Sequence, residues 1–171
     1  MKLQNLVAQA RLDSPLGPIT IAATAKGLAG LWFDGQAHHP GPLEAALDAQ
    51  QPFIAMARDE LERYWRGGHR GRFKVRLDVQ GTAFQQAVWR TLLDIPTGRT
   101  STYAAVAASA GSARAVRAAG AAIGRNPLSV IVPCHRVLGR DGSLTGYAGG
   151  LERKQALLRL EGALPGQLRR A

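Results

Sequence analysis

The residues with the clearest chemical potential lie in one stretch of the chain. Cys134 is the only cysteine, and His135 follows it directly. A thiol attacks as the thiolate, and a neighbouring imidazole is a common means of raising the thiolate fraction. Pro133 fixes its own φ angle and restricts Val132, so the backbone that leads to the thiol is stiff. These residue types in this order favour a cysteine nucleophile assisted by histidine.

A purely structural reading of the same stretch stays open. Free cysteine is among the most frequently buried residue types, and many cysteines only pack. The apolar run at residues 128–132 is typical of a short buried strand that would end near Cys134. Consecutive side chains of a strand point to opposite faces, so His135 can serve Cys134 only through a sharp turn or a bridging water.

Glu161 is a second candidate, near the end of a helix predicted over residues 151–161. On a helical wheel it falls between Leu157 and Leu158, within the apolar face, which it shares with Lys154. A carboxylate there is desolvated and lies at the negative end of the helix dipole. It therefore needs a cationic or hydrogen-bonding partner, and an imidazole is suitable.

Two short helices are predicted before the cysteine. Ser101 or Thr102 can cap a helix over Tyr103–Ser109, and a second helix is expected over residues 113–124 after a three-residue turn that contains glycine. Such a pair is typical of a helix-turn-helix. Many helical hairpins bind nothing, so the spacing alone does not establish nucleic-acid binding.

The second of these helices has two contrasting faces. Its apolar face carries Val116, Ala119, Gly120 and Ile123, and its opposite face carries Arg114, Arg117, Ala118 and Ala121 without an acidic residue. Small side chains permit close approach, and unpaired arginines suit phosphates or the space left by an extruded base. The plainer alternative is a solvated arginine face.

The net charge of +10 is distributed unevenly. Residues 1–80 hold ten Lys/Arg against eight Asp/Glu, which gives +2, and residues 81–171 hold twelve against four, which gives +8. Codon bias toward arginine can explain the total but not this asymmetry. A strongly basic second half indicates a polyanionic partner.

The first half reads as a small α/β domain over residues 1–80. Strands are expected at residues 19–23, 30–33 and 73–79, and a helix at Pro52–Trp65. A boundary is expected near residue 80, and Thr82 can cap the helix Ala83–Leu93 that opens a second domain over residues 81–171.

The composition fits a globular protein in a reducing cytoplasm. One cysteine excludes an internal disulfide and a cysteine-rich zinc site. No signal peptide is recognised, and no apolar run reaches the ~18 residues of a membrane span. His38, His39 and His69 could bind a metal, but a solvated loop is the favoured interpretation, so neither metal nor cofactor is expected.

Several short motifs together resemble one known family. The segments around Pro133-Cys134-His135-Arg136, Asn126-Pro127, Tyr103 and Tyr147-Ala148-Gly149-Gly150 are similar to those of the O6-alkylguanine-DNA alkyltransferases, the methylated-DNA–protein-cysteine methyltransferases, over about residues 81–162. The resemblance implies an α/β N-terminal domain of the ribonuclease-H-like type and a mainly α C-terminal domain with a helix-turn-helix. It also implies DNA repair, in which the alkyl group of O6-alkylguanine, and less efficiently of O4-alkylthymine, moves irreversibly and stoichiometrically to the protein after base flipping.

The resemblance also implies roles for individual residues. Cys134 would be the acceptor thiol, His135 its base through a water molecule, and Glu161 the carboxylate that orients the imidazole. Asn126 would order the turn and the water around the thiol. Tyr103 would donate a proton to the leaving guanine and press on the 3′ phosphate.

Further implied contacts concern DNA and the flipped base. Arg117 would intercalate, with Arg114 as the alternative, and Ala118 and Ala121 would face the minor groove. The base pocket would be formed by Tyr147, Val137, Ala148 and Gly149. Ala148 stands where some relatives have serine, so one hydrogen bond to O6 would be missing.

The implied partner is double-stranded DNA containing alkylated guanine, bound by a monomer that can cluster along the duplex. Two rival functions stay open. One is a binder that only senses alkylated DNA, against which Cys134 argues. The other is a cysteine hydrolase that uses the same cysteine, histidine and glutamate with many turnovers.

Overall fold

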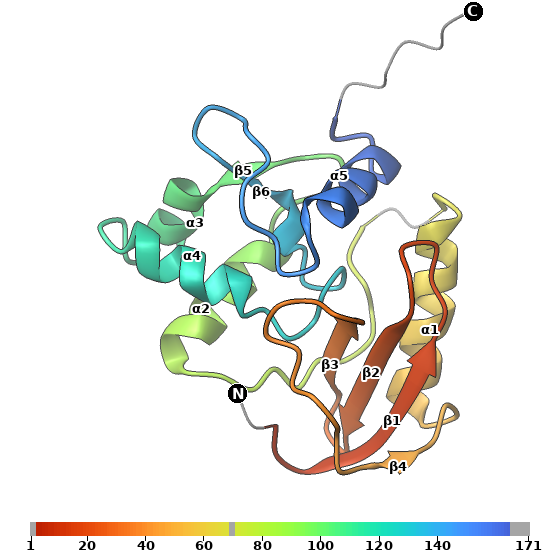
Figure 1. The fold of residues 1–171 in the computed structure, drawn as a ribbon. Coiled ribbons are helices and arrows are strands. Elements are labelled where there is room, and N and C mark those ends of the chain that lie inside the picture. Colours follow the sequence, from red (N-terminus) through yellow and green to blue (C-terminus); the bar gives the residue numbers. More distant parts are fainter. Residues whose placement is uncertain (1–2, 69–70, 165–171) are drawn as a thin grey trace, which may run out of the picture.

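The computed structural model describes residues 3–68 and 71–164, and its elements form two groups that pack side by side (Figure 1). The first group contains the strands β1 (Leu6–Leu12), β2 (Ile19–Thr24), β3 (Leu28–Phe33) and β4 (Ala46–Leu47) and the helix α1 (Pro52–Trp65). The second contains the helices α2 (Ala83–Leu93), α3 (Tyr103–Ser109), α4 (Val116–Gly124) and α5 (Leu151–Leu160), the 3-10 helix η1 (Cys134–Arg136), and the short strands β5 (Ser101–Thr102) and β6 (Val137–Leu138).

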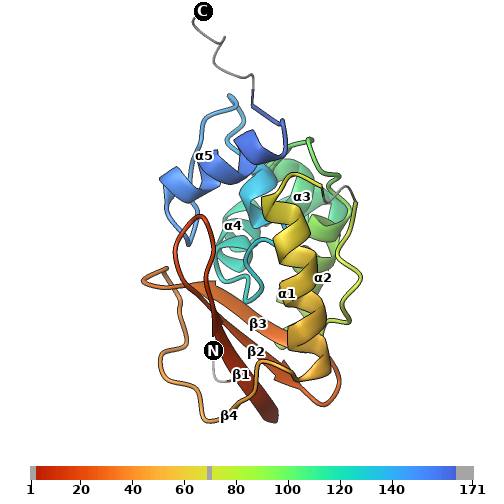
Figure 2. The same ribbon diagram turned by 90° about the vertical axis from the view of Figure 1, so that its right-hand side faces the viewer.

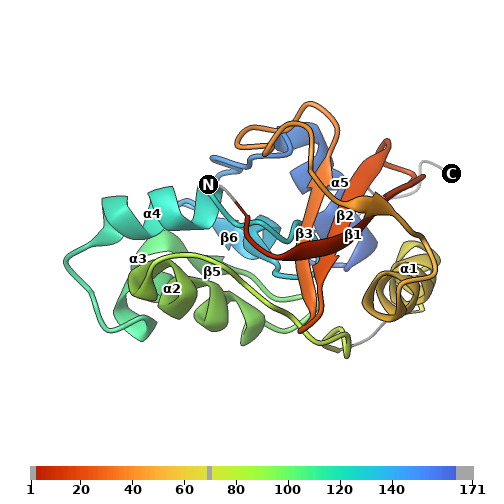
Figure 3. The same ribbon diagram turned by 90° about the horizontal axis from the view of Figure 1, so that it is seen from below.

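The four-stranded sheet has the order β3-β2-β1-β4, with β4 parallel to β1 and the other pairs antiparallel. Helix α1 lies on one side of the sheet and the helices α2–α4 lie on the other, as Figure 3 shows. All six residues of β3 are buried. A strand covered on both faces has no polar face, which explains why residues 30–33 read as a continuous apolar run.

The outer edge of β3 is covered by two segments that the sequence predicted as strands. Leu28 exchanges backbone hydrogen bonds with residues 76 and 78, and Leu31 exchanges them with residues 127 and 129. Neither segment continues the pairing beyond an isolated bridge, so the predicted strands at 73–79 and 128–132 are wrong. The edge of β3 is long enough for one bridge to each segment, and both segments then turn away.

The helical predictions hold with small shifts at the ends. Thr82 and Gln85 form a reciprocal capping box at the start of α2, and Thr102 caps α3 through its side-chain oxygen. Helix α4 begins at Val116 rather than at residue 113, because the preceding residues form a turn. The indole of Trp89 donates to the carbonyl oxygen of Ala122 at 2.8 Å and ties α2 to α4.

Two features connect the helical group to the cysteine segment. The parallel pair β5–β6 matches Ser101 with Val137 and Thr102 with Leu138, which brings the start of α3 beside the residues that follow η1. Helix α5 ends in a Schellman motif: Gly162 has a φ of +71°, and the amide of Ala163 donates to Leu158. Figure 2 shows α5 packed across the end of the molecule where α1 also ends.

A single hydrophobic core extends through both groups, with Phe33, Leu61, Trp89 and Leu157 among its members. Within the part of the chain that the structure describes, no helix is long and apolar enough to cross a bilayer.

Candidate active site

The thiol stands at a sharp turn and not at the end of a strand. Pro133 has φ −82° and ψ 62°, and the amide of Cys134 donates to the carbonyl oxygen of Val132 at 2.8 Å, which is an inverse γ-turn. Cys134 is then the first residue of η1, so His135 follows in a helical turn. The objection that the two side chains point to opposite faces of a strand therefore no longer applies, although neighbouring side chains of a helical turn do not face each other either, so a bridging water is still required.

A second tight turn lies just before it. Val130 has a φ of +72°, and the amide of Ile131 donates to the carbonyl oxygen of Ser129 at 2.9 Å. A β-branched residue in this region of φ costs about 1–3 kcal/mol and persists only where its surroundings enforce it. The pairing of residues 127 and 129 with β3 supplies part of that restraint.

Asn126 adds a further restraint on this turn. Its side-chain amide nitrogen lies 2.7 Å from the carbonyl oxygen of Val132 and 3.0 Å from Sγ of Cys134, and its oxygen accepts from the amide of Leu128 at 3.0 Å. One buried side chain thus ties both ends of the turn to the thiol. The resemblance implied that Asn126 orders this turn and a water molecule around the thiol, and that role stays a prediction.

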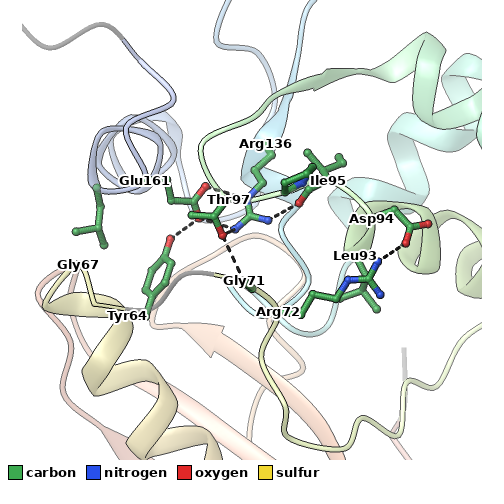
Figure 4. Close-up of a pocket in the computed structure, with 12 residues that line it drawn as sticks. Tyr64, Gly67, Gly71, Arg72, Leu93, Asp94, Ile95, Thr97, Arg136 and Glu161 are labelled. Atoms are coloured by element: carbon green, nitrogen blue, oxygen red, sulfur yellow. Dashed lines mark hydrogen bonds and ion pairs between the residues drawn. The ribbon is translucent and has the colours of Figure 1, made fainter.

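Glu161 and His135 are in direct contact. Nε2 of His135 lies 2.8 Å from Oε1 of Glu161, and both side chains are essentially inaccessible to solvent. Arg136 binds the same carboxylate through two nitrogens, with Nε 2.8 Å from Oε2 and Nη2 2.8 Å from Oε1. The phenol of Tyr64, from α1, donates to Oε1 at 2.7 Å (Figure 4). The buried carboxylate therefore has a cation and two further donors.

These contacts determine the protonation of the pair. Burial alone would raise the pKa of Glu161, but hydrogen bonds from His135 and Arg136 and the charge of Arg136 lower it to about 2. Burial lowers the pKa of His135 below its ordinary value, against the opposing effect of Glu161. The pair at neutral pH is thus a carboxylate and a neutral imidazole whose proton is on Nε2, which leaves Nδ1 as an acceptor.

The thiol is held in its neutral form. Burial raises the pKa of Cys134, while the hydrogen bond from Asn126 and the charge of Lys154 oppose the shift. The residue is only 4% exposed. Nδ1 of His135 is buried and has no hydrogen-bond partner in the described protein, so its lone pair is free to accept a proton.

Tyr103 and Lys154 hold the loop that follows the cysteine. The phenol of Tyr103 donates to the carbonyl oxygen of Thr145 at 2.9 Å, and Nζ of Lys154 donates to the same oxygen at 2.7 Å and to that of Val137 at 2.5 Å. Burial lowers the pKa of Lys154 to about 8. The carbonyl of Val137, a residue of the implied base pocket, therefore already accepts one hydrogen bond.

Three residues of the implied base pocket, Tyr147, Ala148 and Gly149, belong to this loop, and Val137 comes shortly before it. The ring of Tyr147 lies edge-on to the imidazole of His135, with centroids 6.5 Å apart. Gly149 is required beside it, because a Cβ there would lie 2.6 Å from Cε1 of Tyr147. The carbonyl of Ala148 accepts from the amide of Ala37 at 2.8 Å, so the first group of elements helps to fix the pocket.

Except for Tyr103, the predicted DNA-contacting residues lie apart from this cluster, on the outer surface of α4 and the turn before it. Arg114, Arg117, Ala118 and Ala121 are all exposed, while Ala119, Ala122 and Ile123 are buried. In the described ranges no group of three or more His, Cys, Asp and Glu side chains could hold a metal ion. His69 lies outside the described residues.

Sequence reasoning missed three residues of the cluster. Arg136 belongs to the motif around the cysteine, and Lys154 lies on the apolar face of its helix. Both residues could have been recognised from the sequence, because a buried charge needs partners. Tyr64 carried none, because an aromatic residue on the inner face of a helix normally only packs. A pocket of about 480 Å³ is lined by Tyr64, Arg136 and Glu161 among others.

Comparisons with known proteins agree with this arrangement. Residues 7–79 match the ribonuclease-like domain of 6-O-methylguanine DNA methyltransferase, and residues 83–163 match its DNA-binding domain. The methylated-DNA–protein-cysteine methyltransferase of Mycobacterium tuberculosis is 45% identical over 150 residues, which cover 88% of this chain and 89% of that protein. A protein of the same name from Methanosarcina barkeri is also 45% identical, over 88% of this chain and 94% of its own length.

A solved structure shows the same fold. The crystal structure of M. tuberculosis OGT in complex with DNA superposes with a TM-score of 0.83 at 43% identity, covering 92% of this chain and 94% of that one. The sheet with α1 and the group of helices are thus features of a known architecture. On these grounds the chain belongs to the 6-O-methylguanine DNA methyltransferase family.

Proposed function

We propose that this protein repairs DNA by transferring an alkyl group from O6 of guanine in duplex DNA to Sγ of Cys134. The observation that carries the proposal is a buried thiol held by Asn126 and followed directly, in the same helical turn, by an imidazole that binds a carboxylate held in its charged form. The relatives named for this reaction, and the one crystallised with DNA, support the choice of substrate.

The base in this reaction is His135. Its Nε2–H is held by Glu161, so Nδ1 accepts the thiol proton, through a bridging water. The carboxylate stabilises the imidazolium that forms without taking the proton, because its pKa is about 2. Since burial keeps the pKa of His135 low, the base remains neutral across the neutral pH range.

The leaving guanine needs a proton as the bond to its oxygen breaks. Sγ forms a bond to the alkyl carbon while the bond from that carbon to O6 breaks, and the proton lost by the thiol is balanced by one gained by guanine. Tyr103 supplies that proton when its phenol turns from the carbonyl of Thr145 to the base. The phenolate left on Tyr103 then takes a proton from water, and the imidazolium of His135 releases the thiol proton to water, so both residues return to their neutral forms. The product is a thioether, which has no carbonyl that water could attack, so each molecule reacts once.

Burial of the thiol requires base flipping. A sulfur atom in a residue that is 4% exposed cannot reach a base inside a stacked duplex. Extruding the base costs a few kcal/mol, and less for a poorly paired alkylated guanine. We assign the support of the opened duplex to the exposed face of α4, with Arg117 in the space left by the base and Arg114 as the alternative, and Ala118 and Ala121 against the minor groove.

The pocket around Tyr147, Val137, Ala148 and Gly149 would hold the flipped base, and weaker transfer from O4-alkylthymine follows from the similar position of its alkyl group. The two family matches lie on either side of residue 80, which supports a division into an N-terminal domain over residues 1–80 and an alkyl-acceptor domain over 81–171.

The test is incubation of the protein and of Cys134→Ser with a duplex that contains O6-methylguanine. Mass spectrometry should show one added methyl group per wild-type molecule and none on the variant, and both proteins should bind the duplex equally well. Binding without added mass would favour the sensor. Many turnovers on a small ester or amide would favour the hydrolase.

A further inference from the structure

We propose that Tyr64 is a positioning residue for the reaction at Cys134, acting through its hydrogen bond to Glu161. The inference rests on the proposed alkyl transfer and extends it. It gives the first group of elements, which contains none of the reacting residues, an influence on the reaction through Glu161.

The contact joins two distant parts of the chain. The hydroxyl of Tyr64, near the end of α1, lies 2.7 Å from Oε1 of Glu161, which is 97 residues later and caps α5. Tyr64 is 3% exposed, and the Glu161 side chain is 1% exposed. Figure 4 shows the phenol pointing from α1 at the carboxylate, on the side opposite the guanidinium of Arg136.

The hydroxyl of Tyr64 shares its acceptor, one carboxylate oxygen of Glu161, with other donors. Oε1 of Glu161 receives three donors, from Tyr64, His135 and Arg136, all at 2.7–2.8 Å. Each donor withdraws electron density from the carboxylate and makes it a weaker acceptor for the others. The hydrogen bond from Tyr64 therefore limits how strongly Glu161 can stabilise an imidazolium at His135.

Tyr64 is built to remain a donor in a fixed place. Burial, followed by the charge of Glu161, raises the pKa of its phenol, so the proton stays on throughout the working range. Its ring lies edge-on to that of Trp65, with centroids 5.0 Å apart, and 5.7 Å from that of Phe73. The hydroxyl cannot leave the carboxylate without moving these rings.

The other ionisable groups around His135 come from η1, from α5 with its C-cap, and from the loop before α5. Some of them shift the pKa of His135, and the others carry no charge at rest. Arg136 of η1 and Lys154 of α5 both lower the pKa of His135 through their charges, and Glu161 raises it. Tyr147, from the loop, and the thiol of Cys134 are neutral at rest. Removing the hydroxyl of Tyr64 leaves all of these groups in place and takes one hydrogen bond away from Glu161.

Tyr64→Phe should therefore make the carboxylate a stronger acceptor and raise the pKa of His135. The acidic limb of the transfer rate against pH is expected to move to higher pH by about one unit, the size of effect that one hydrogen bond has on an ionised group. Above that limb the rate should stay within about threefold of the wild type, because the neutral imidazole is still present.

The experiment measures single-turnover transfer from O6-methylguanine duplex, with protein in excess, between pH 5 and 8.5, for the wild type, Tyr64→Phe and Trp65→Phe. The matched control removes packing from the same helix and keeps the hydroxyl, so it should be less stable but keep the wild-type profile. A purely structural role for Tyr64 predicts parallel profiles, and that result would overturn the inference.

A second readout does not depend on transfer. In proteins that carry Cys134→Ser, an NMR titration of the His135 ring should show the same upward shift for Tyr64→Phe and none for Trp65→Phe. If the wild type transfers the methyl group but Tyr64→Phe shifts neither the pH profile nor the pKa of His135, only the role of Tyr64 is wrong. If the wild type itself transfers nothing, the proposed function is wrong.

Discussion

The carboxylate of Glu161 is held in its charged form by its neighbours, and its replacement by glutamine offers a quantitative test of this arrangement. Its pKa is lowered from 4.5 to about 2. At 1.36 kcal/mol per pKa unit, this difference corresponds to about 3 kcal/mol of folding free energy. A lowered pKa means that this contribution is complete above pH 4.5 and is lost as the pH falls from there toward 2.

Glu161→Gln also leaves the guanidinium of Arg136, whose side chain is 7% exposed, without its anion. Breaking a buried pair from one side costs about 3–5 kcal/mol. We therefore expect the variant to be less stable than the wild type by about that amount at pH 7. The difference should shrink by most of ~3 kcal/mol as the pH is lowered below 4.5, because the wild type then loses the same charge.

The assay is urea unfolding of both proteins at a series of pH values from 7 to 3, analysed as the difference between them so that other carboxylates cancel. Glu62→Gln is the matched control: Glu62 is 58% exposed and lies 3.9 Å from Arg66, a surface pair that should contribute less than about 1 kcal/mol at any pH. A wild-type advantage over Glu161→Gln that stays constant down to pH 3 would refute the reasoning.

Two further predictions follow from the hydrogen bonds around the thiol. Asn126→Ala removes the amide that ties Val132 and Cys134 together, so stability should fall by about 2–4 kcal/mol and single-turnover transfer by about tenfold or more; an unchanged transfer rate in a destabilised variant would contradict the role of the turn. Lys154→Met leaves the carbonyls of Val137 and Thr145 without their ammonium donor. Urea unfolding should show a loss of about 2–4 kcal/mol, and saturating duplex should not restore the wild-type transfer rate.

Local signals in the sequence were sufficient for much of the fold. Thr82 and Thr102 mark the starts of α2 and α3 because a side-chain oxygen can satisfy the free amides of a first turn wherever the helix lies. The exposed face of α4 follows from helical periodicity alone. The reactive pair was visible as well, since Cys134 and His135 are adjacent, and the need of Glu161 for a partner follows from its place on an apolar face.

Which segments pair with β3, and over what length, could be decided only from the tertiary structure. Residues 73–79 alternate like a strand and residues 128–132 are apolar like one, yet both bridge the same edge of β3 and neither forms a strand. A strand needs a partner along its whole length, and the sequence of the segment itself does not say whether one is available. The thiol is therefore positioned by two tight turns, and one of them is strained at Val130.

The partners of Glu161 and Lys154 could not be predicted from neighbouring residues in the sequence either. Tyr64 meets Glu161 across 97 residues, and the ammonium of Lys154 is accommodated by backbone carbonyls, which every residue possesses and no motif records. The sequence determined which groups could react, because reactivity belongs to residue types. The tertiary structure decided their protonation states, because desolvation and hydrogen bonding depend on what the rest of the chain brings beside them.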